Sequence, residues 1–175
     1  MIDFSQNYFA LFGLQPRYRF DPEKLDVAYR ALQRAVHPDR YAAAGDAERR
    51  VALQSSARVN EAYRALKDPV GRAQYLLSLR GIDAFDETNT ALPAEFLQRE
   101  LERREAVGEA QAARDADRLD ALLREVRSDA AVLETGLADR LDAEAWERAR
   151  DAVRELRFLT KVAGDIEAAL AEGDS

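Results

Sequence analysis

The sequence predicts an all-α protein. Its 175 residues include only 8 glycines and 5 prolines, too few for the many turns of an all-β protein. Alanine, leucine, arginine and glutamate, which are good helix formers, dominate the composition. Apolar residues also recur at helical spacing in several segments. With 47% hydrophobic and 34% charged residues, the chain has enough apolar side chains for a core and a well-solvated surface.

The N-terminal part of the chain is expected to begin with two helices. Residues 8–14 form an apolar stretch of one or two helical turns, which Gly13 ends. Asp21 then has the position of an N-cap, and Pro22 that of the first helical residue. The apolar face of this second helix follows at i, i+4, i+7 and i+11, in Leu25, Tyr29, Leu32 and Val36.

A proline ends the second helix and opens the turn to a third. Pro38 disfavours the α conformation at His37, so the helix is expected to end there. Residues 41–45 are expected to form a loop, and Asp46 to cap a third helix that ends at Asp68-Pro69. Two antiparallel helices joined by a loop of roughly eight residues make a helical hairpin.

The remaining residues are expected to form a short helix, a connection and a second domain. The short helix covers residues 71–80 and stops at Gly81, and residues 82–92 show little periodicity. The predicted domains are therefore residues 1–81 and residues 93–175, joined by a linker over residues 82–92. The second domain is expected to be a bundle of three helices, over residues 93–107, 109–140 and 142–171, the last one capped by Asp142.

Charge is distributed unevenly along the chain. Residues 1–84 contain 13 Lys/Arg and 10 Asp/Glu, whereas residues 85–175 contain 13 and 23. This asymmetry indicates two modules with different partners, although acidic residues on the exposed faces of long helices would give the same pattern. The net charge of −7 argues against nucleic acid as the main partner.

Several protein classes are excluded by what the sequence lacks. Without cysteine, the chain cannot hold disulfides, zinc ribbons or thiolate-bound iron–sulfur clusters. The N-terminal residues do not have the pattern of a secretory signal, and no apolar run reaches membrane-spanning length. We therefore expect a cytoplasmic protein without a membrane partner.

The single histidine, His37, precedes Pro38 and Asp39. On residue type alone it could act as a base, bind a metal or contact a partner. One histidine and no cysteine leave no Cys/His pair and no histidine metal cluster. No nucleophile motif supports a Ser-His-Asp triad, and no glycine-rich phosphate loop is present. The sequence therefore predicts no catalytic residue and no metal site.

Arginines lie on both sides of this tripeptide. Arg30 and Arg34 lie off the apolar stripe of the preceding helix, and Arg40 follows Asp39 directly. An exposed basic strip that ends in a proline-fixed turn suits the docking of an acidic partner. Alternatively, Arg30 and Arg34 are ordinary solvated residues that pair with neighbours such as Asp26.

In this order and spacing, these residues resemble a J-domain. The matching segments are Ala28-Tyr29-Arg30, then His37-Pro38-Asp39-Arg40, then a helix with residues 59–66 and Asp68-Pro69, and residues 8–14 are similar to the family's first helix. J-domains dock onto the ATPase of DnaK-type chaperones and stimulate ATP hydrolysis. The resemblance implies that His37, Pro38 and Asp39 form the signalling element, and that the chaperone-binding face also includes Tyr29, Arg30, Arg34 and Arg40.

The rest of the chain indicates which group of J-domain proteins the sequence resembles. The sequence lacks the glycine/phenylalanine-rich linker and the cysteine-rich zinc module of typical J-domain proteins, and its Tyr75-Leu76-Leu77 segment leads into an acidic helical module. This combination resembles the HscB-type iron–sulfur cluster co-chaperones, with further matches at Phe96-Leu97, Leu101-Glu102, Arg104-Glu105 and residues 153–159. In that family the C-terminal module holds an iron–sulfur scaffold protein of the IscU type.

The first helix of the second module has two different faces. On a helical wheel Phe96 and Val107 point one way, whereas Leu97 and Leu101 point another. Phe158 lies opposite the main stripe of the last helix, where it either packs against a neighbouring helix or stays exposed. The resemblance implies that Leu97, Leu101 and Phe158 form one exposed apolar patch for the scaffold. By the same resemblance, the patch is surrounded by Gln98, Glu102, Arg104, Glu105 and Glu109.

These observations predict a monomeric co-chaperone of iron–sulfur cluster assembly that has no cofactor of its own. Its J-domain would stimulate a dedicated, HscA-like ATPase, while the C-terminal domain delivers an IscU-like scaffold and so raises its effective concentration at the chaperone. Two alternatives remain open. The C-terminal domain could recruit a different client, or the protein could be an enzyme that handles a metal or a proton with His37.

Overall fold

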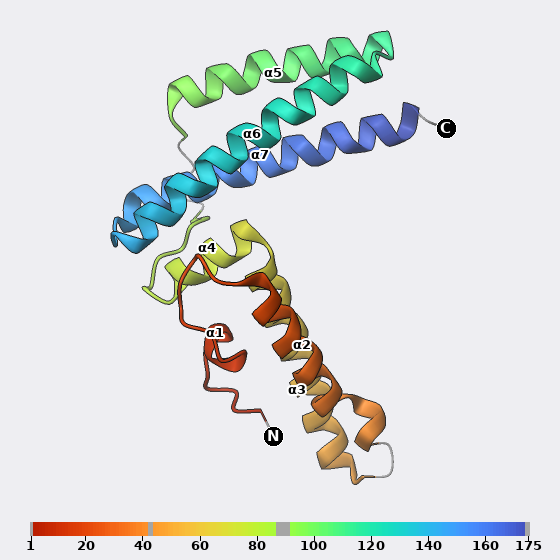
Figure 1. The fold of residues 1–175 in the computed structure, drawn as a ribbon, viewed down its shortest axis with the longest axis vertical. Coiled ribbons are helices and arrows are strands. Elements are labelled where there is room, and N and C mark those ends of the chain that lie inside the picture. The colour runs from red at the N-terminus through yellow and green to blue at the C-terminus, as the bar shows by residue number, and fades with distance from the viewer. Residues whose placement is uncertain (1, 42–43, 87–91, 174–175) are drawn as a thin grey trace. The chain divides into compact units, whose positions relative to one another are not determined.

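Figure 1 shows a chain built from helices. The computed structural model describes residues 2–41, 44–86 and 92–173, and every regular element in these ranges is helical. The predicted all-α fold class is therefore confirmed. The chain divides into two compact units, residues 1–80 and residues 81–175, and each is described by itself below.

The first unit is a helical hairpin flanked by two shorter helices. Its elements are α1 (Tyr8–Leu11), α2 (Pro22–Val36), the 3₁₀ turn η1 (Pro38–Tyr41), α3 (Asp46–Lys67) and α4 (Pro69–Ser78). Helices α2 and α3 pack against one another, and both α1 and α4 pack against α3. The apolar stripe of each helix faces this core, where the largest fully buried side chains are Phe9, Leu25, Val59, Leu66 and Leu77.

Local capping sets the ends of the hairpin helices. Asp21 caps α2 as predicted, since its Oδ1 accepts a hydrogen bond of 3.0 Å from the backbone N–H two residues further on. The α2 helix ends before Pro38, also as predicted. Asp46, however, is the first residue of α3 and not its cap. Gly45 occupies the extended N-cap position, and the Asp46 carboxylate pairs with Arg49 instead of with the backbone.

Asp68 joins α3 to α4 without a spacer. Its backbone N–H donates to the carbonyl of Arg64 at the end of α3, and its Oδ2 accepts a hydrogen bond of 2.6 Å from Gly71 N in α4. Pro69 takes the first helical position, so α4 begins earlier than the predicted residue 71. A Cβ on Gly71 would lie 3.0 Å from the carbonyl oxygen of Ala65, so α4 starts in close contact with the α3 backbone.

The second unit is a bundle of three helices, as predicted. They are α5 (Ala94–Ala113), α6 (Ala116–Asp142) and α7 (Trp146–Gly173). Helices α6 and α7 pack along one another, and α5 packs against both. Their shared core includes the buried residues Phe96, Leu122, Val126, Leu159 and Ile166.

The first helix of the bundle is longer than predicted. The predicted break lies near Gly108, yet α5 continues through this residue to Ala113. A glycine lowers helix stability by about 1 kcal/mol relative to alanine, and burial of the neighbouring Val107 and Ala110 offsets this. Arg114 ends the helix in the left-handed conformation, with φ 55°, and Asp115 caps α6. Because helices usually end at a left-handed glycine, an arginine in this conformation does not reveal the end of the helix in the sequence.

The second turn of the bundle also lies later than predicted. Asp142 was expected to cap the last helix, but it is the final residue of α6. The N–H of Ala145 donates to the carbonyl of Arg140 at 2.9 Å across this turn. Glu144 makes the turn with φ 56°, so both turns of the bundle use a left-handed residue other than glycine.

Two predicted connections lie partly outside the described residues. Of the loop expected over residues 41–45, residues 42–43 fall outside them, and Tyr41 belongs to η1. Of the linker expected over residues 82–92, residues 87–91 fall outside them. Residues 81–86 group with the second unit, where Ala84 is fully buried and its carbonyl accepts a hydrogen bond of 2.7 Å from Arg154 Nε.

Candidate partner-binding sites

The His37-Pro38-Asp39 tripeptide forms the turn that follows α2. His37 is the C-cap residue, with ψ 129°, and Pro38 opens η1. The His37 carbonyl accepts a hydrogen bond of 3.1 Å from Arg40 N, and its Nδ1 accepts one of 3.3 Å from Asp39 N. The side chains of His37 and Asp39 are 52% and 91% exposed. The turn is therefore held by its backbone while both polar side chains stay accessible.

These hydrogen bonds define the groups that a partner would meet. Nδ1 of His37 faces the backbone N–H of Asp39, so Nε2 is the ring nitrogen left open to a partner. Asp39 Oδ2 lies 3.5 Å from the same Nδ1, and this carboxylate is otherwise open to solvent. The turn thus presents an imidazole nitrogen and a carboxylate next to one another, an arrangement suited to recognition by a second protein.

The arginines around the turn form a continuous basic strip. Arg30, Arg34 and Arg40 are all exposed. Arg34 Nε donates to the Arg30 carbonyl at 3.2 Å, and Arg40 Nη1 donates to the Arg34 carbonyl at 3.3 Å. Guanidinium groups at the C-terminal end of a helix interact favourably with its dipole, which holds them near α2. The strip therefore runs along the last turns of α2 to the His37-Pro38-Asp39 turn.

Asp26 pairs mainly with α3 and only secondarily with this strip. Its carboxylate accepts hydrogen bonds from Lys67 Nζ at 2.8 and 2.9 Å and from the Tyr63 hydroxyl at 3.0 Å. The hydrogen bond from Lys67 holds the pKa of Asp26 below its usual value, and the same bond raises the pKa of Lys67. The main partner of Asp26 is therefore Lys67, which links α2 to α3, while the charge of Arg30 makes a weaker contribution that also lowers the pKa of Asp26.

Tyr29 lies between the hairpin helices. Its ring stacks on that of Tyr63, with the centroids 3.9 Å apart, and its hydroxyl donates to Asn60 Oδ1 at 3.0 Å. The hydroxyl also accepts a hydrogen bond of 3.0 Å from Gln33 Nε2. Tyr29 is half-buried, unlike Arg30. Its contacts hold α2 against α3 and thereby position the arginines beside it.

The second candidate site lies on α5 and α7. Leu97 and Leu101 of α5 are 46% and 54% exposed, whereas Phe96 is 4% exposed and Val107 is buried, as the helical wheel predicts. Phe158 of α7 is 36% exposed, and its ring packs edge-on against Phe96 with the centroids 5.6 Å apart. Phe158 was expected either to pack against a neighbouring helix or to stay exposed. The structure shows both in part, because its ring packs against Phe96 while 36% of the residue stays exposed.

Charged and polar side chains accompany the exposed leucines of α5. Gln98 Nε2 donates to Glu102 Oε1 at 2.9 Å, one helical turn further on. Each of the predicted surrounding residues is exposed, namely Gln98, Glu102, Arg104, Glu105 and Glu109. An exposed apolar patch with a charged rim is typical of a protein-binding surface.

An ion-pair network centred on Arg103 connects α5 to α6. The guanidinium of Arg103, whose side chain is 11% exposed, pairs with Glu100 of α5 and with Asp129 of α6. Glu100 is buried, and its Oε2 has no hydrogen-bond partner among the described residues. Arg103 is therefore the main compensation for a buried carboxylate and ties α5 to α6.

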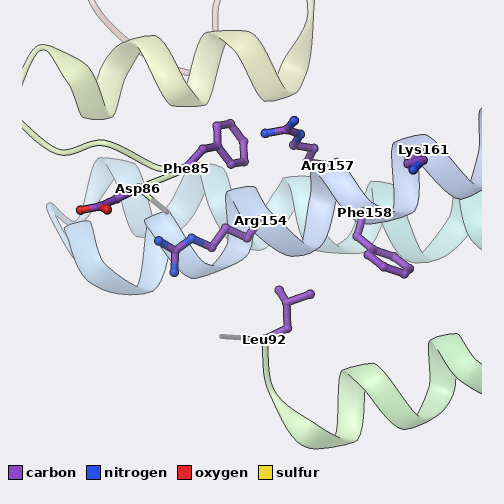
Figure 2. A pocket seen from close by; sticks show the side chains of 7 residues that line it. All are labelled: Phe85, Asp86, Leu92, Arg154, Arg157, Phe158 and Lys161. Carbon is purple, nitrogen blue, oxygen red and sulfur yellow. The ribbon is translucent and has the colours of Figure 1, made fainter. Parts of the chain in front are cut away.

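Three cations of α7 that sequence reasoning missed lie beside this site. Arg154, Arg157 and Lys161 line a pocket that also includes Phe158 (Figure 2). Their spacing of i, i+3 and i+7 places them on one face of the helix, which is a signal visible in the sequence. Among the described residues, no group of three His, Cys, Asp or Glu side chains could hold a metal ion.

Comparison with known proteins identifies the family. Residues 7–75 match the model of the DnaJ domain, and residues 92–167 match that of the HSCB C-terminal oligomerisation domain. The co-chaperone protein HscB homolog of Burkholderia cenocepacia is 48% identical over 95% of each chain. That of Cupriavidus taiwanensis is 51% identical over 95% of this chain and 94% of its own. The chain belongs to the HscB co-chaperone family.

Solved HscB structures share this fold. The chaperone HscB from Vibrio cholerae superposes with a TM-score of 0.86 at 34% identity, covering 95% of this chain and 99% of its own. Human co-chaperone protein HscB gives 0.87 at 25% identity, covering 95% and 83%. The predicted HscB family and its co-chaperone role in iron–sulfur cluster assembly are therefore confirmed. In the described part of the chain, no helix has the length and apolar character needed to cross a membrane.

Proposed function

We propose that the protein holds an IscU-like scaffold on its second unit while its first unit docks on an HscA-like, DnaK-type ATPase. The observation that carries this proposal is the pair of exposed surfaces, one basic and one apolar, on two separate compact units. Each surface is fixed by the packing of its own unit, so each can engage its partner without rearrangement.

The basic strip and the turn after α2 form the proposed chaperone contact. Arg30, Arg34 and Arg40 attract and orient an acidic surface, because like-signed charges along one face raise the rate of encounter. Nε2 of His37 and the carboxylate of Asp39 then make directional contacts. To stimulate ATP hydrolysis, these contacts must be stronger in the hydrolysis-competent state of the ATPase than in its other state.

The apolar patch of the second unit is the proposed scaffold contact. Leu97, Leu101 and Phe158 would be covered by apolar side chains of the scaffold, and the polar rim would fix its orientation. Because one chain carries both surfaces, a bound scaffold reaches the chaperone at a high effective concentration. The chain itself provides no group that reacts with ATP.

The test of this proposal is ATP turnover by the HscA-like chaperone with this protein, with and without the scaffold. His37→Gln removes the imidazole from an exposed position, so stimulation should be lost while scaffold affinity and helicity stay unchanged. Glu23→Gln, an equally conservative change at the other end of α2, is the matched control and should stimulate normally. Loss of scaffold binding with stimulation retained would show that the two units have the opposite roles.

The second candidate function is recruitment of a different client by the same apolar patch. The exposed leucines favour the binding of a protein, but their apolar character alone does not specify which client protein binds. A scaffold that does not bind the wild-type protein, or that binds equally well after Leu97→Ala/Leu101→Ala/Phe158→Ala, would favour this candidate.

A further inference from the structure

A pocket of about 300 Å³ opens on α7 next to Phe158. Its described lining consists of Phe85, Asp86, Leu92, Arg154, Arg157, Phe158 and Lys161, all from the second unit. Figure 2 shows Phe158 extending toward the side on which Leu92 lies, and Arg157 extending toward the Phe85 ring. The pocket therefore combines apolar walls with three positively charged side chains and one carboxylate.

Arg154 carries a charge that its surroundings compensate only in part. Its side chain is 7% exposed, and its Nε donates to the Ala84 carbonyl at 2.7 Å. Nη1 lies 3.8 Å from Asp151 Oδ1, and neither Nη1 nor Nη2 has a hydrogen-bond partner among the described residues. A buried guanidinium with unused donors makes its surroundings favourable for a negative charge.

The two outer cations are available to a partner. Arg157 is exposed, and its guanidinium carbon lies 4.2 Å from the centroid of the Phe85 ring. This cation–π contact holds the charge at the rim of the pocket. Lys161 is exposed one turn further along α7. A ligand that enters between Phe158 and Leu92 would therefore meet positive charge beside the apolar walls.

This local positive charge contrasts with the rest of the unit. Residues 85–175 contain 23 acidic and 13 basic residues, so most of the surface repels an acidic segment. The pocket is at the lower end of the size range of ligand sites, about 300–1,000 Å³, which suits one or two side chains of a protein partner. It also shares Phe158 with the proposed scaffold surface, so a partner that covers Phe158 reaches the pocket.

We propose that this pocket receives an apolar side chain of the scaffold that lies next to an Asp or Glu. The apolar side chain would fill the space between Phe158 and Leu92, and the neighbouring carboxylate would pair with Arg157 and Lys161. This inference rests on the proposed scaffold contact. It adds the requirement that the scaffold carries an acidic residue at this point, which the apolar contacts of Leu97 and Leu101 do not require.

The test compares scaffold affinity of the full-length wild-type protein with that of Arg157→Glu/Lys161→Glu by calorimetry at several salt concentrations. We expect the double variant to bind on the order of tenfold more weakly and with a smaller dependence on salt, because two attractive rim charges become repulsive. Arg124→Glu, at an exposed position of α6, is the matched control and should keep most of the affinity. Circular dichroism checks that each variant is folded.

A charge exchange makes the test specific. Single Asp or Glu residues of the scaffold are changed to Lys, one at a time. The scaffold variant whose acidic residue normally pairs with Lys161 should bind the Lys161→Glu protein better than it binds the wild-type protein, because the charge pair is restored in reverse. Wild-type affinity in Arg157→Glu/Lys161→Glu, together with lost affinity in Leu97→Ala/Leu101→Ala, would overturn the pocket proposal and leave the scaffold contact standing. Failure of the wild-type protein to bind the scaffold would overturn both.

Discussion

Replacing the two exposed leucines of α5 should weaken scaffold binding strongly while leaving the protein folded. In Leu97→Ala/Leu101→Ala, each substitution removes three carbons, or about 2.4 kcal/mol for a side chain that is fully buried on binding. Because the side chains are 46% and 54% exposed in the free protein, only about half of this is available to a partner, or about 1.2 kcal/mol each. The sum of about 2.4 kcal/mol corresponds to a decrease in affinity on the order of 50-fold.

The assay is titration calorimetry of the scaffold with wild-type and variant proteins, combined with urea unfolding. The unfolding free energy should fall by no more than about 1.2 kcal/mol for each site, because only the buried half of each side chain contributes to the fold. Val132→Ala is the matched control, because Val132 is 72% exposed on α6 and lies outside the proposed patch. A decrease in affinity of less than about threefold would refute the assignment of this face as the main scaffold contact.

The remaining predictions concern stability. Arg103→Ala should lower the unfolding free energy by about 3 kcal/mol or more in urea titrations, because it leaves the carboxylate of Glu100 buried without a counter-charge. Burial raises the pKa of Tyr8 to about 12, above the value near 10 in the unfolded chain, so the folded state keeps its phenolic proton longer. The contribution of Tyr8 to stability is therefore fully present below pH 10 and should be lost as pH rises from about 10 to 12, and Tyr8→Phe should make the unfolding free energy less sensitive to pH in that range.

Each of these two measurements has an outcome that would contradict its reasoning. Arg104→Ala removes an exposed arginine adjacent to Arg103 and should change stability by less than about 0.5 kcal/mol. An equal loss in both variants would contradict the role given to the buried pair. An unaltered alkaline slope in Tyr8→Phe would show that another group controls the pH dependence of stability in this range.

Sequence reasoning predicted those features that depend on local chemistry. The N-cap at Asp21, the end of α2 before Pro38 and the two faces of α5 follow from capping preferences, proline sterics and helical periodicity. The exposure of Arg30 and Arg34 follows from the same periodicity. Such features are set within one or two helical turns and need no knowledge of the fold.

Features that depend on tertiary packing could not be predicted in the same way. Gly108 reads as a helix break, but contacts of its neighbours with α6 and α7 keep α5 continuous. The actual turns lie at Arg114 and Glu144, whose left-handed conformations are unusual for their residue types. Arg103 pairs with Asp129, and Arg154 donates to the carbonyl of Ala84; because these two partners are distant in the sequence, neither the ion-pair network nor the cation-rimmed pocket was predicted.

The shared cap at Asp68 also restricts how the length of α3 can change. A single residue inserted into α3 would rotate everything after it by about 100° about the helix axis and would turn α4 away from its packing surface. No flexible spacer exists at Asp68 to absorb that rotation, and the Cβ clearance at Gly71 leaves no room for a shift. Only insertions or deletions close to a whole number of turns, such as about seven residues for two turns or about eleven for three, would preserve both the orientation of α4 and the face that α3 presents to α2. Relatives that retain this junction should therefore differ in hairpin length by steps of this kind and not by one or two residues.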